Sequence, residues 1–163
     1  MSIVSWNCRG LGNLATVQGV VDIVKELRPS IIFLMETKIS YSRAKETLRM
    51  QGFYNSEGMD NEGSSGGIIM GWNDDIEVVI KEKHQNYVDC QVRSREGELP
   101  WRLTGYYAYS DTRRRREAWD MLRRLAEHNT MPWIVIGDFN DILYESEKKG
   151  NVPQPPWRLK GFT

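Results

Sequence analysis

The stretch of this chain that decides its fold is Trp133-Ile134-Val135-Ile136-Gly137-Asp138-Phe139-Asn140. Its first four residues are large and apolar, which is typical of a buried strand. In an extended chain, residues two apart project from the same face, so we expect Asp138 and Asn140 to point at one spot where the strand ends. A carboxylate beside an amide at such a place can orient a water molecule and position a substrate. A simple loop cap is the alternative for so short a motif.

Two earlier segments end in a similar way. Residues 3–10 form a short β-type run that reaches the amide of Asn7 and then a glycine. Residues 31–38 form an apolar run whose first acidic side chain is Glu36. The chain thus has three apolar strands that end in Asn7, in Glu36 and in the Asp138–Asn140 pair. We expect the three strand ends to converge on one site.

The motifs at these strand ends resemble those of the endonuclease/exonuclease/phosphatase superfamily. They are Trp-Asn-x-Arg-Gly at residues 6–10, Leu-x-Glu-Thr at residues 34–37 and Gly-Asp-Phe-Asn at residues 137–140, in the order typical of that superfamily. Within it, the amino-acid sequence of residues 5–12 and 101–107 is most similar to that of the endonuclease domain of plant LINE-type (non-LTR) retrotransposons. The resemblance runs from residue 3 almost to Thr163, and it implies two packed β-sheets flanked by helices.

The resemblance implies a divalent cation held by Glu36 and Asn7, because the superfamily uses the matching glutamate and asparagine in this way. Mg²⁺, or Mn²⁺ in its place, prefers oxygen ligands and needs only one or two carboxylates from the protein. The alternative for Glu36 is a salt bridge at the end of its strand. The alternative for Asn7 is a turn residue that bonds its own backbone.

The resemblance also implies catalytic roles for Asp138, Asn140 and Tyr107. Asp138 is the candidate that orients or deprotonates the attacking water, and Asn140 would hold the scissile phosphate or steady Asp138. Tyr107 matches the tyrosine whose hydroxyl reaches a phosphate oxygen, although a tyrosine on a strand usually serves packing. The superfamily often has asparagine three residues after this tyrosine, whereas the shorter Ser110 stands there in this chain.

One motif of the superfamily is not found in these 163 residues. Superfamily domains end with a Ser-Asp-His segment whose histidine contacts the phosphate, whereas residues 156–162 here resemble the middle of such a domain. We therefore expect residues 1–163 to be a single partial domain with an incomplete second sheet, an exposed apolar edge and a tendency to associate. The loss of one phosphate-stabilising group typically lowers a rate by ~10²–10³, so we expect weak or absent activity.

The charge of the chain is balanced overall and uneven along its length. Residues 1–100 hold 11 basic and 14 acidic side chains, a net charge of −3, whereas residues 101–163 hold 11 basic and 8 acidic side chains, a net charge of +3. Much of the positive excess is the run Arg113-Arg114-Arg115-Arg116 followed by Arg123-Arg124. A solvated helix face is one interpretation of this run. Contact with a DNA phosphate backbone is the other, because arginine clusters suit phosphates.

Size and composition fit an intracellular domain. A chain of 163 residues with six Trp and seven Tyr can bury a core of its own. It contains no apolar stretch that approaches the ~20 residues of a membrane span, and its N-terminus enters a strand directly, so we expect no membrane segment and no signal peptide. Cys8 and Cys90 are too few for a disulfide framework and lack the spacing of a zinc site. A retrotransposon endonuclease would act on DNA in the nucleus.

The hydrophobic pattern predicts helices alternating with strands and a run of hairpins, that is, an α/β sandwich with mixed sheets. Besides the three site strands, we expect helices at residues 14–27, 42–50 and 112–128, a short strand at 52–54, and strands at 67–72, 76–81, 87–93 and 101–108. Residues 55–67 are polar and rich in glycine and serine, so we expect a turn or mobile loop there. In the last helix we expect Trp119, Leu122 and Leu125 to face inward and the arginines to face outward.

These observations favour a Mg²⁺-dependent phosphodiesterase that nicks DNA and derives from a retrotransposon. A phosphatase that acts on a lipid or a small phosphoester is the first alternative, because the same motifs serve both reactions. The polar character of residues 55–67 argues against a lipid substrate, since a lipid enzyme more often exposes an apolar loop. The second alternative is a non-catalytic remnant that binds nucleic acid weakly or not at all.

Overall fold

The computed structural model describes residues 1–94, 97–142, 145–147 and 149–150. The chain forms two compact units, Met1–Tyr107 with Met131–Asp138, and Ala108–Thr130 with Phe139–Thr163. Residues 156–162, which resemble the middle of a superfamily domain, lie outside the described residues. Within the described ranges, none of the helices is long and apolar enough to cross a membrane.

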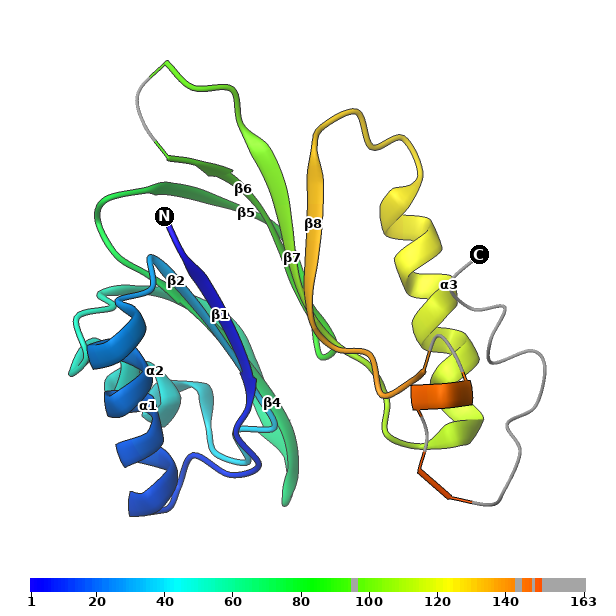
Figure 1. Ribbon diagram of the computed structural model, residues 1–163, viewed down its shortest axis with the longest axis horizontal. Coiled ribbons are helices and arrows are strands. Elements are labelled where there is room, and N and C mark those ends of the chain that lie inside the picture. Colours follow the sequence, from blue (N-terminus) through cyan, green and yellow to red (C-terminus); the bar gives the residue numbers. More distant parts are fainter. Residues whose placement is uncertain (95–96, 143–144, 148, 151–163) are drawn as a thin grey trace. The chain divides into compact units, whose positions relative to one another are not determined.

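The first unit contains two four-stranded sheets (Figure 1). One sheet has the strand order β1-β2-β4-β3, and the other has the order β5-β6-β7-β8. The strands are β1 (Ile3–Asn7), β2 (Ile31–Met35), β3 (Asn55–Glu62), β4 (Ser65–Trp72), β5 (Glu77–His84), β6 (Tyr87–Arg93), β7 (Trp101–Tyr107) and β8 (Trp133–Asp138). The pairs β1–β2 and β7–β8 are parallel, and the other neighbours are antiparallel. The predicted sandwich of two mixed sheets is therefore confirmed.

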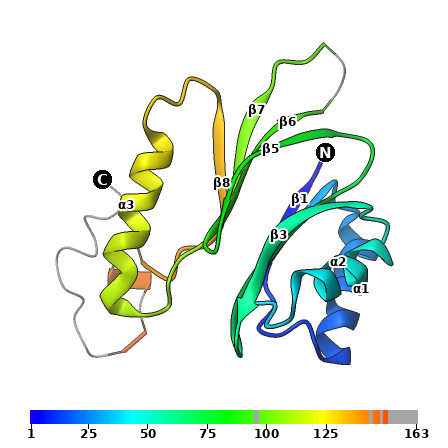
Figure 2. The same cartoon turned by 180° about the vertical axis from the view of Figure 1, so that it is seen from behind.

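The core of the first unit lies on both faces of the first sheet. β2 is buried at every position, because its side chains alternate between two packed layers. Ile32 and Leu34 pack with the helices α1 (Leu14–Leu27) and α2 (Tyr41–Arg49), which cover the outer face (Figure 2). Phe33 packs on the other side, in the layer between the two sheets. This double burial holds the end of β2 in place, and the predicted site begins at that end.

Local signals fix α1 at both of its ends, and its bounds are those predicted. Asn13 caps the N-terminus, where its Oδ1 atom accepts a hydrogen bond of 2.8 Å from the backbone amide of Thr16. Arg28 ends the helix in a left-handed conformation with φ of 42°, and Pro29 follows it. The chain then enters β2, so Arg28 precedes that strand and Glu36 follows it.

The predicted loop at residues 55–67 and the predicted short strand at residues 52–54 are both wrong. Residues 55–62 form the edge strand β3, which turns through Gly63 and Ser64 into β4, whereas residues 52–54 lie outside any strand. Backbone pairing with β4, rather than apolar side chains, stabilises this strand. Its polar composition therefore gives no sequence pattern from which a strand would be predicted. Gly58 lets the two backbones meet, because a Cβ atom there would lie 2.2 Å from the carbonyl oxygen of Ile68.

The second unit contains the helix α3 (Arg115–Ala126), preceded by a 3-10 turn at Thr112–Arg114. Asp111 caps this turn, because its Oδ1 atom accepts a hydrogen bond of 2.9 Å from the amide of Arg113. The predicted helix is therefore confirmed, with its first turn tightened. The fully buried residues of α3 are Ala118, Met121 and Leu125.

The inward and outward faces predicted for this helix need two corrections. Trp119 and Leu122 are only half-buried. Trp119 donates a hydrogen bond of 3.0 Å to Asp141 through Nε1, and its ring stacks on Phe139 with 6.0 Å between centroids. The side chain of Arg115 is 16% exposed and lies 3.8 Å from Asp141, so it does not face outward. The segment after β8 supplies a carboxylate to the helix, and the helical pattern alone contains no sign of it.

Candidate active site

The four predicted site residues of the first unit lie at the ends of two parallel strand pairs, one pair in each sheet. Asn7 ends β1 and is paired with Met35, the last residue of β2, directly before Glu36. Tyr107 ends β7 and is paired with Asp138, the last residue of β8. Parallel strands bring their carboxyl ends to the same edge of a sheet, so each sheet presents two polar side chains at one edge.

A hydrogen bond joins the two edges. The Nδ2 atom of Asn7 donates to Oδ2 of Asp138 at 3.0 Å. A carboxylate can only accept, so this contact fixes the orientation of the amide and directs the Asn7 Oδ1 atom elsewhere. That oxygen is buried and has no hydrogen-bond partner among the described residues. A buried acceptor without a partner costs roughly 1–3 kcal/mol, and a cation ligated by this oxygen would remove the cost.

Glu36 has a left-handed backbone with φ of 56°. The hydrogen bonds on either side of it hold this conformation: the Cys8 amide donates to the Met35 carbonyl at 3.1 Å, and the Thr37 amide donates to the Gly67 carbonyl at 3.1 Å. Non-glycine residues in this region of φ/ψ space carry strain and concentrate at functional sites. Among the described residues Glu36 takes part in no ion pair, so the alternative of a strand-end salt bridge has no support.

The contact between Thr37 and Gly67 requires glycine. Thr37 is buried, and a Cβ atom on Gly67 would lie 2.3 Å from its Oγ1 atom. Gly67 also has φ of 87°, which other residues rarely adopt. The start of β4 therefore holds the Glu36 segment through backbone contacts. A larger residue at position 67 would displace Thr37 and, with it, this segment.

Tyr107 is buried, and its phenol shares one environment with Glu36 and Asp138. Burial is the largest cause that raises its pKa, followed by the charge of Glu36, a hydrogen bond to the Glu36 carboxylate and the charge of Asp138. The guanidinium of Arg9 acts in the opposite direction and lowers the pKa of Tyr107. The phenol is therefore protonated at neutral pH and acts as a hydrogen-bond donor.

Asn86, which is not among the predicted site residues, holds the backbone of Tyr107. The Tyr107 amide donates to the Asn86 carbonyl at 2.7 Å, and the Asn86 side chain donates from Nδ2 to the Tyr107 carbonyl at 2.7 Å. Asn86 is 3% exposed and stands in the turn between β5 and β6. No local motif predicts this role of Asn86, because its partner Tyr107 lies 21 positions away in the chain.

Gly137 allows β8 to approach β7 beside the site. A Cβ atom there would lie 1.8 Å from the carbonyl oxygen of Tyr106, and the residue has φ of 142°. The glycine of the Gly-Asp-Phe-Asn motif therefore serves the contact between the two backbones. Asp138 follows it directly and takes its position from this contact.

Asn140, the fifth predicted site residue, belongs to the second unit. β8 ends at Asp138, so the two-residue alternation used to predict the direction of Asn140 does not extend to it. It has a left-handed backbone with φ of 48°, and its Nδ2 atom donates to the Ala108 carbonyl at 2.8 Å. The first unit alone thus brings together Asn7, Glu36, Tyr107 and Asp138.

Three of these four residues, Asn7, Glu36 and Asp138, offer donor atoms that suit a hard divalent cation. They are carboxylate and amide oxygens, which Mg²⁺ and Mn²⁺ prefer. Within the described ranges, no three or more side chains of His, Cys, Asp and Glu form a group able to hold a metal ion. Cys8 stands beside Asn7, but its thiol is buried, burial raises its pKa, and it donates to the Met35 carbonyl at 3.3 Å. The orphaned Asn7 oxygen and Glu36 are therefore the atoms that fit a metal.

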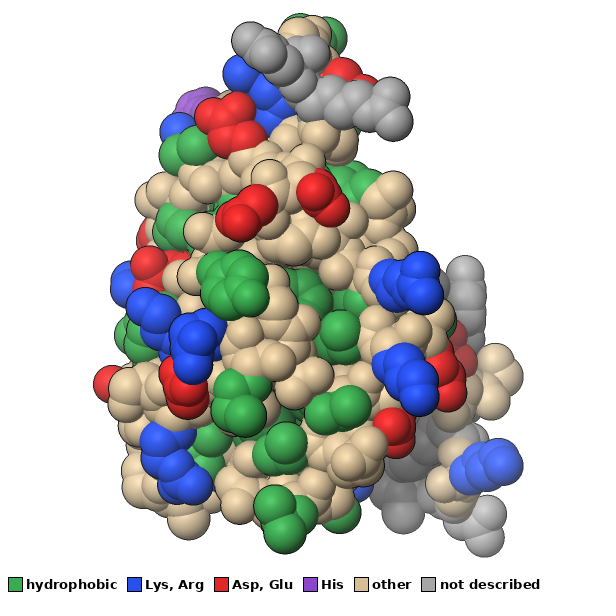
Figure 3. All heavy atoms as spheres, turned by 90° about the vertical axis from the view of Figure 1, so that its left-hand side faces the viewer, with side chains coloured by type: hydrophobic (Ala, Val, Ile, Leu, Met, Phe, Trp, Pro, Cys, Tyr) green, Lys and Arg blue, Asp and Glu red, His purple; other side chains and the backbone are tan. Residues whose placement is uncertain are grey.

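The arginines predicted to contact DNA are in the second unit and are largely engaged with acidic side chains. Arg113, Arg114 and Arg123 form ion pairs of 2.9 to 3.2 Å with acidic residues two or three positions away. These local ion pairs favour the interpretation of the arginine run as a solvated helix face. Figure 3 draws another face of the molecule, on which the described Lys and Arg side chains are scattered among acidic and hydrophobic ones.

Comparison with solved structures shows the same fold in several proteins. The chain matches the 3′ phosphatase NExo from Neisseria, bound to a product DNA hairpin, with 16% identity, a TM-score of 0.64, and coverage of 90% of this chain and 60% of that chain. It matches an AP endonuclease from Archaeoglobus fulgidus with 15% identity, a TM-score of 0.64, and coverage of 89% and 60%. It matches the human Nocturnin catalytic domain, with bound sulfate, with 17% identity, a TM-score of 0.60, and coverage of 85% and 64%.

The chain spans about three-fifths of the length of these solved chains. No curated protein matches its sequence. The model of the Endonuclease/Exonuclease/phosphatase family matches residues 4–158, which include all three motifs and all five predicted site residues. The chain therefore belongs to the endonuclease/exonuclease/phosphatase family.

Proposed function

We propose that this chain hydrolyses phosphodiester bonds of DNA with the help of a divalent cation, Mg²⁺ or Mn²⁺. The activities in the family's name all cleave phosphoester bonds. The observation that carries the proposal is the contact between Asn7 and Asp138, which leaves a buried amide oxygen without a partner. Such an atom beside Glu36 has the character of a metal ligand, and Asp138 beside it has the character of a base.

The residues of the site have distinct roles in this proposal. Glu36 and Asn7 would hold the cation, which neutralises charge on the phosphate when bound. Asp138 accepts the proton of the attacking water, and the Asn7 amide keeps the carboxylate oriented for that transfer. The protonated Tyr107 phenol donates a hydrogen bond to a phosphate oxygen. As the water oxygen bonds to phosphorus, the ester oxygen on the opposite side leaves.

The role of Asn140 is proposed on the family motif alone. It would hold the scissile phosphate or steady Asp138, and its amide would have to leave the Ala108 carbonyl to reach a ligand. The remaining catalytic roles depend on residues of the first unit. Loss of Asn140 should therefore affect substrate binding more than the position of the metal.

DNA is the substrate class that the comparisons and motifs favour. Two structural relatives are a phosphatase bound to a DNA hairpin and an AP endonuclease. The amino-acid sequence of residues 5–12 supports an origin in a LINE-type retrotransposon, and such an enzyme would act in the nucleus. Arg116 and Arg124 are the exposed arginines of α3 without an ion pair among the described residues, so they remain candidates for phosphate contact.

A plasmid-nicking assay tests the proposal. Supercoiled plasmid is incubated with the chain in Mg²⁺, in Mn²⁺ and in chelator, alongside the variants Glu36→Gln and Asp138→Asn. Glu26→Gln on α1 is the matched control, because Glu26 is exposed and forms no ion pair among the described residues. We expect metal-dependent nicking by the chain and by the control, and a loss of ~10²–10⁴ in Asp138→Asn.

Other outcomes separate the competing functions. Nicking that survives the chelator or persists at full rate in Asp138→Asn would contradict the proposal. A folded chain that leaves plasmid intact but hydrolyses a small phosphomonoester would be a phosphatase. A folded chain that does neither would be a non-catalytic remnant, and its salt-dependent binding to DNA would then be the property to measure.

A further inference from the structure

A short loop after β1 lies along the Glu36 segment. Two backbone hydrogen bonds bracket Glu36: the Cys8 amide donates to the Met35 carbonyl at 3.1 Å, and the Leu11 amide donates to the Thr37 carbonyl at 2.8 Å. Arg9 stands between the two donors in the sequence, just as Glu36 stands between the two acceptors. The backbone of Arg9 is therefore held beside the proposed metal ligand.

The backbone of Arg9 is strained in the same way as that of Glu36. Its φ is 50°, and the φ of Glu36 is 56°. Left-handed conformations of non-glycine residues are strained and persist where the surrounding structure fixes them. The following Gly10, with φ of 118°, lets the loop return to Leu11. A strained arginine fixed beside a strained glutamate indicates that the position of this side chain matters.

The charge of Arg9 has no partner in the described part of the chain. The residue is exposed, and among the described residues it forms no hydrogen bond and no ion pair. Its backbone is nevertheless held beside Glu36 by the hydrogen bonds of Cys8 and Leu11, which places the residue at the edge of the site. A cation at this edge that forms no ion pair among the described residues is available to an anionic ligand.

We propose that Arg9 binds the scissile phosphate of the substrate, with its guanidinium donating to the non-bridging oxygens. A guanidinium presents parallel N–H groups that match two oxygens of a phosphate, which a lysine ammonium cannot do. Arg9 would thus supply a positive charge on the exposed side of a site whose own groups are negative. This inference rests on the proposed function, because it assigns a binding role at the same site.

The chain offers a closely matched control for this test. Arg28 is also exposed and left-handed, with φ of 42°, but it stands before β2, at the end opposite to Glu36. Arg9→Gln and Arg28→Gln therefore remove the same charge from similar backbones at the two ends of one strand. Arg9→Gly is a second variant that removes the side chain and suits the left-handed backbone, so a folding defect can be distinguished from a binding defect. Arg9→Lys keeps the positive charge and removes the parallel N–H groups of the guanidinium.

The first measurement is the affinity for duplex DNA in chelator at several salt concentrations. We expect the slope of log K against log salt to fall by about 0.9 in Arg9→Gln and Arg9→Gly, as for the loss of one phosphate contact, and to stay unchanged in Arg28→Gln. The second measurement is the nicking rate in Mg²⁺. We expect the nicking rate to fall by ~10²–10³ in Arg9→Gln and in Arg9→Gly, which both lack the positive charge. We expect Arg9→Lys, which keeps the charge, to recover part of this rate.

The outcomes for this inference and for the proposed function are distinct. Equal salt slopes and nicking rates in the wild-type chain and both Arg9 variants would overturn the role of Arg9 and leave the nuclease activity standing. Equal effects of Arg9→Gln and Arg28→Gln would also overturn it, because the effect would then be one of general charge. A wild-type chain that binds DNA with an Arg9-dependent slope but never nicks would support the role of Arg9 and contradict the proposed hydrolysis.

Discussion

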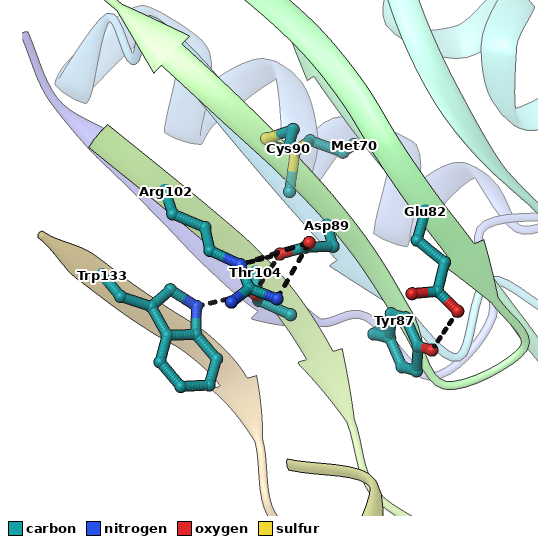
Figure 4. Close-up of polar contacts among 8 residues, drawn as sticks. All are labelled: Met70, Glu82, Tyr87, Asp89, Cys90, Arg102, Thr104 and Trp133. Carbon is teal, nitrogen blue, oxygen red and sulfur yellow. Dashed lines mark hydrogen bonds and ion pairs between the residues drawn. The ribbon is translucent and has the colours of Figure 1, made fainter. Parts of the chain in front are cut away.

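Two polar clusters of the first unit differ in how completely they are paired. The structural cluster consists of Asp89, Arg102, Thr104 and Trp133 (Figure 4). Arg102 donates to Asp89 at 2.9 Å from Nε, and the hydroxyl of Thr104 donates to the same carboxylate at 2.6 Å. The Nε1 atom of Trp133 donates to Thr104 at 2.8 Å, and the guanidinium of Arg102 lies 4.7 Å from the Trp133 ring centroid.

The candidate active site has the opposite character. It brings together two carboxylates, Glu36 and Asp138, and it leaves the buried Asn7 oxygen without a partner among the described residues. The structural cluster joins one carboxylate to one guanidinium and orders its neighbours through hydrogen bonds. A buried polar group with all of its partners stabilises one conformation, whereas an incompletely paired group has capacity for a ligand. The comparison therefore separates polar residues that stabilise the fold from those that form the proposed site.

Breaking the structural cluster should give the largest effect on stability. In Arg102→Met the Asp89 carboxylate, whose side chain is 6% exposed, would lose its cation, and we expect the free energy of unfolding to fall by about 3–5 kcal/mol. Urea denaturation measures it. The matched control is Arg93→Met, because Arg93 lies 3.6 Å from Glu77 in an exposed pair, and we expect a cost of about 1 kcal/mol or less.

A double variant sharpens this result. Asp89→Val together with Arg102→Met removes both charges, and it should be more stable than Arg102→Met alone, since the buried carboxylate is then gone. If Arg102→Met were as stable as Arg93→Met, the ion pair would have no structural role. The comparison between the two clusters would then fail.

A ligand should stabilise the incompletely paired site but not the structural cluster. At a Mg²⁺ concentration 100 times the dissociation constant, we expect a gain of about 2.7 kcal/mol in the free energy of unfolding. Differential scanning fluorimetry would show this as a shift of the melting temperature by roughly 5–10 °C for a chain of this size. Glu36→Gln should abolish the shift, and Glu26→Gln should retain it. A shift of equal size in Glu36→Gln would place the metal elsewhere.

The two buried thiols give the smallest effect, at alkaline pH. Burial raises the pKa of Cys90 from 9.0 to about 12, so the folded chain keeps a proton that the unfolded chain releases. This contribution to stability is complete below pH 9 and is lost as the pH rises toward 12, at about 1.4 kcal/mol per pH unit for one proton. We expect urea denaturation between pH 8 and pH 10.5 to show this fall.

Single thiol variants test the cause of the fall. Cys90→Ala should flatten the pH dependence, because Cys90 is fully buried in the layer between the sheets. Cys8→Ala, at the edge of the site, is the comparison and should flatten it less. Identical pH slopes in the wild-type chain and in Cys90→Ala would mean that the thiol does not hold its proton through burial.

The sequence predicts those parts of the fold that are encoded locally. The bounds of α1 follow from the cap at Asn13 and the stop at Pro29, and those of β6 and β8 follow from apolar runs. The edge strand β3 escapes prediction, because its stability comes from the backbone of β4. Three strands of the site are likewise recognised by their motifs, since each motif ends an apolar run.

Residues that act through distant partners have no local signal. Asn86 binds the backbone of Tyr107, and Asp89 pairs with Arg102 across two strands. Arg9 forms part of a recognised motif, but its sequence position does not reveal that it lies beside Glu36 with its charge unpaired. The direction of Asn140 was predicted by continuing a strand beyond its end. In each case the missing information is the pairing of segments far apart in the chain.

The close backbone contact at Gly137 affects how inactive relatives of this chain should be recognised. An alanine at this position would collide with the carbonyl of Tyr106 and force β8 away from β7, and Asp138 would move with it. One nucleotide change could therefore disrupt the candidate site while every acidic, amide and phenolic side chain of it survives. A sequence survey that scores only those side chains would count such a relative as intact, so this glycine belongs among the positions that it scores.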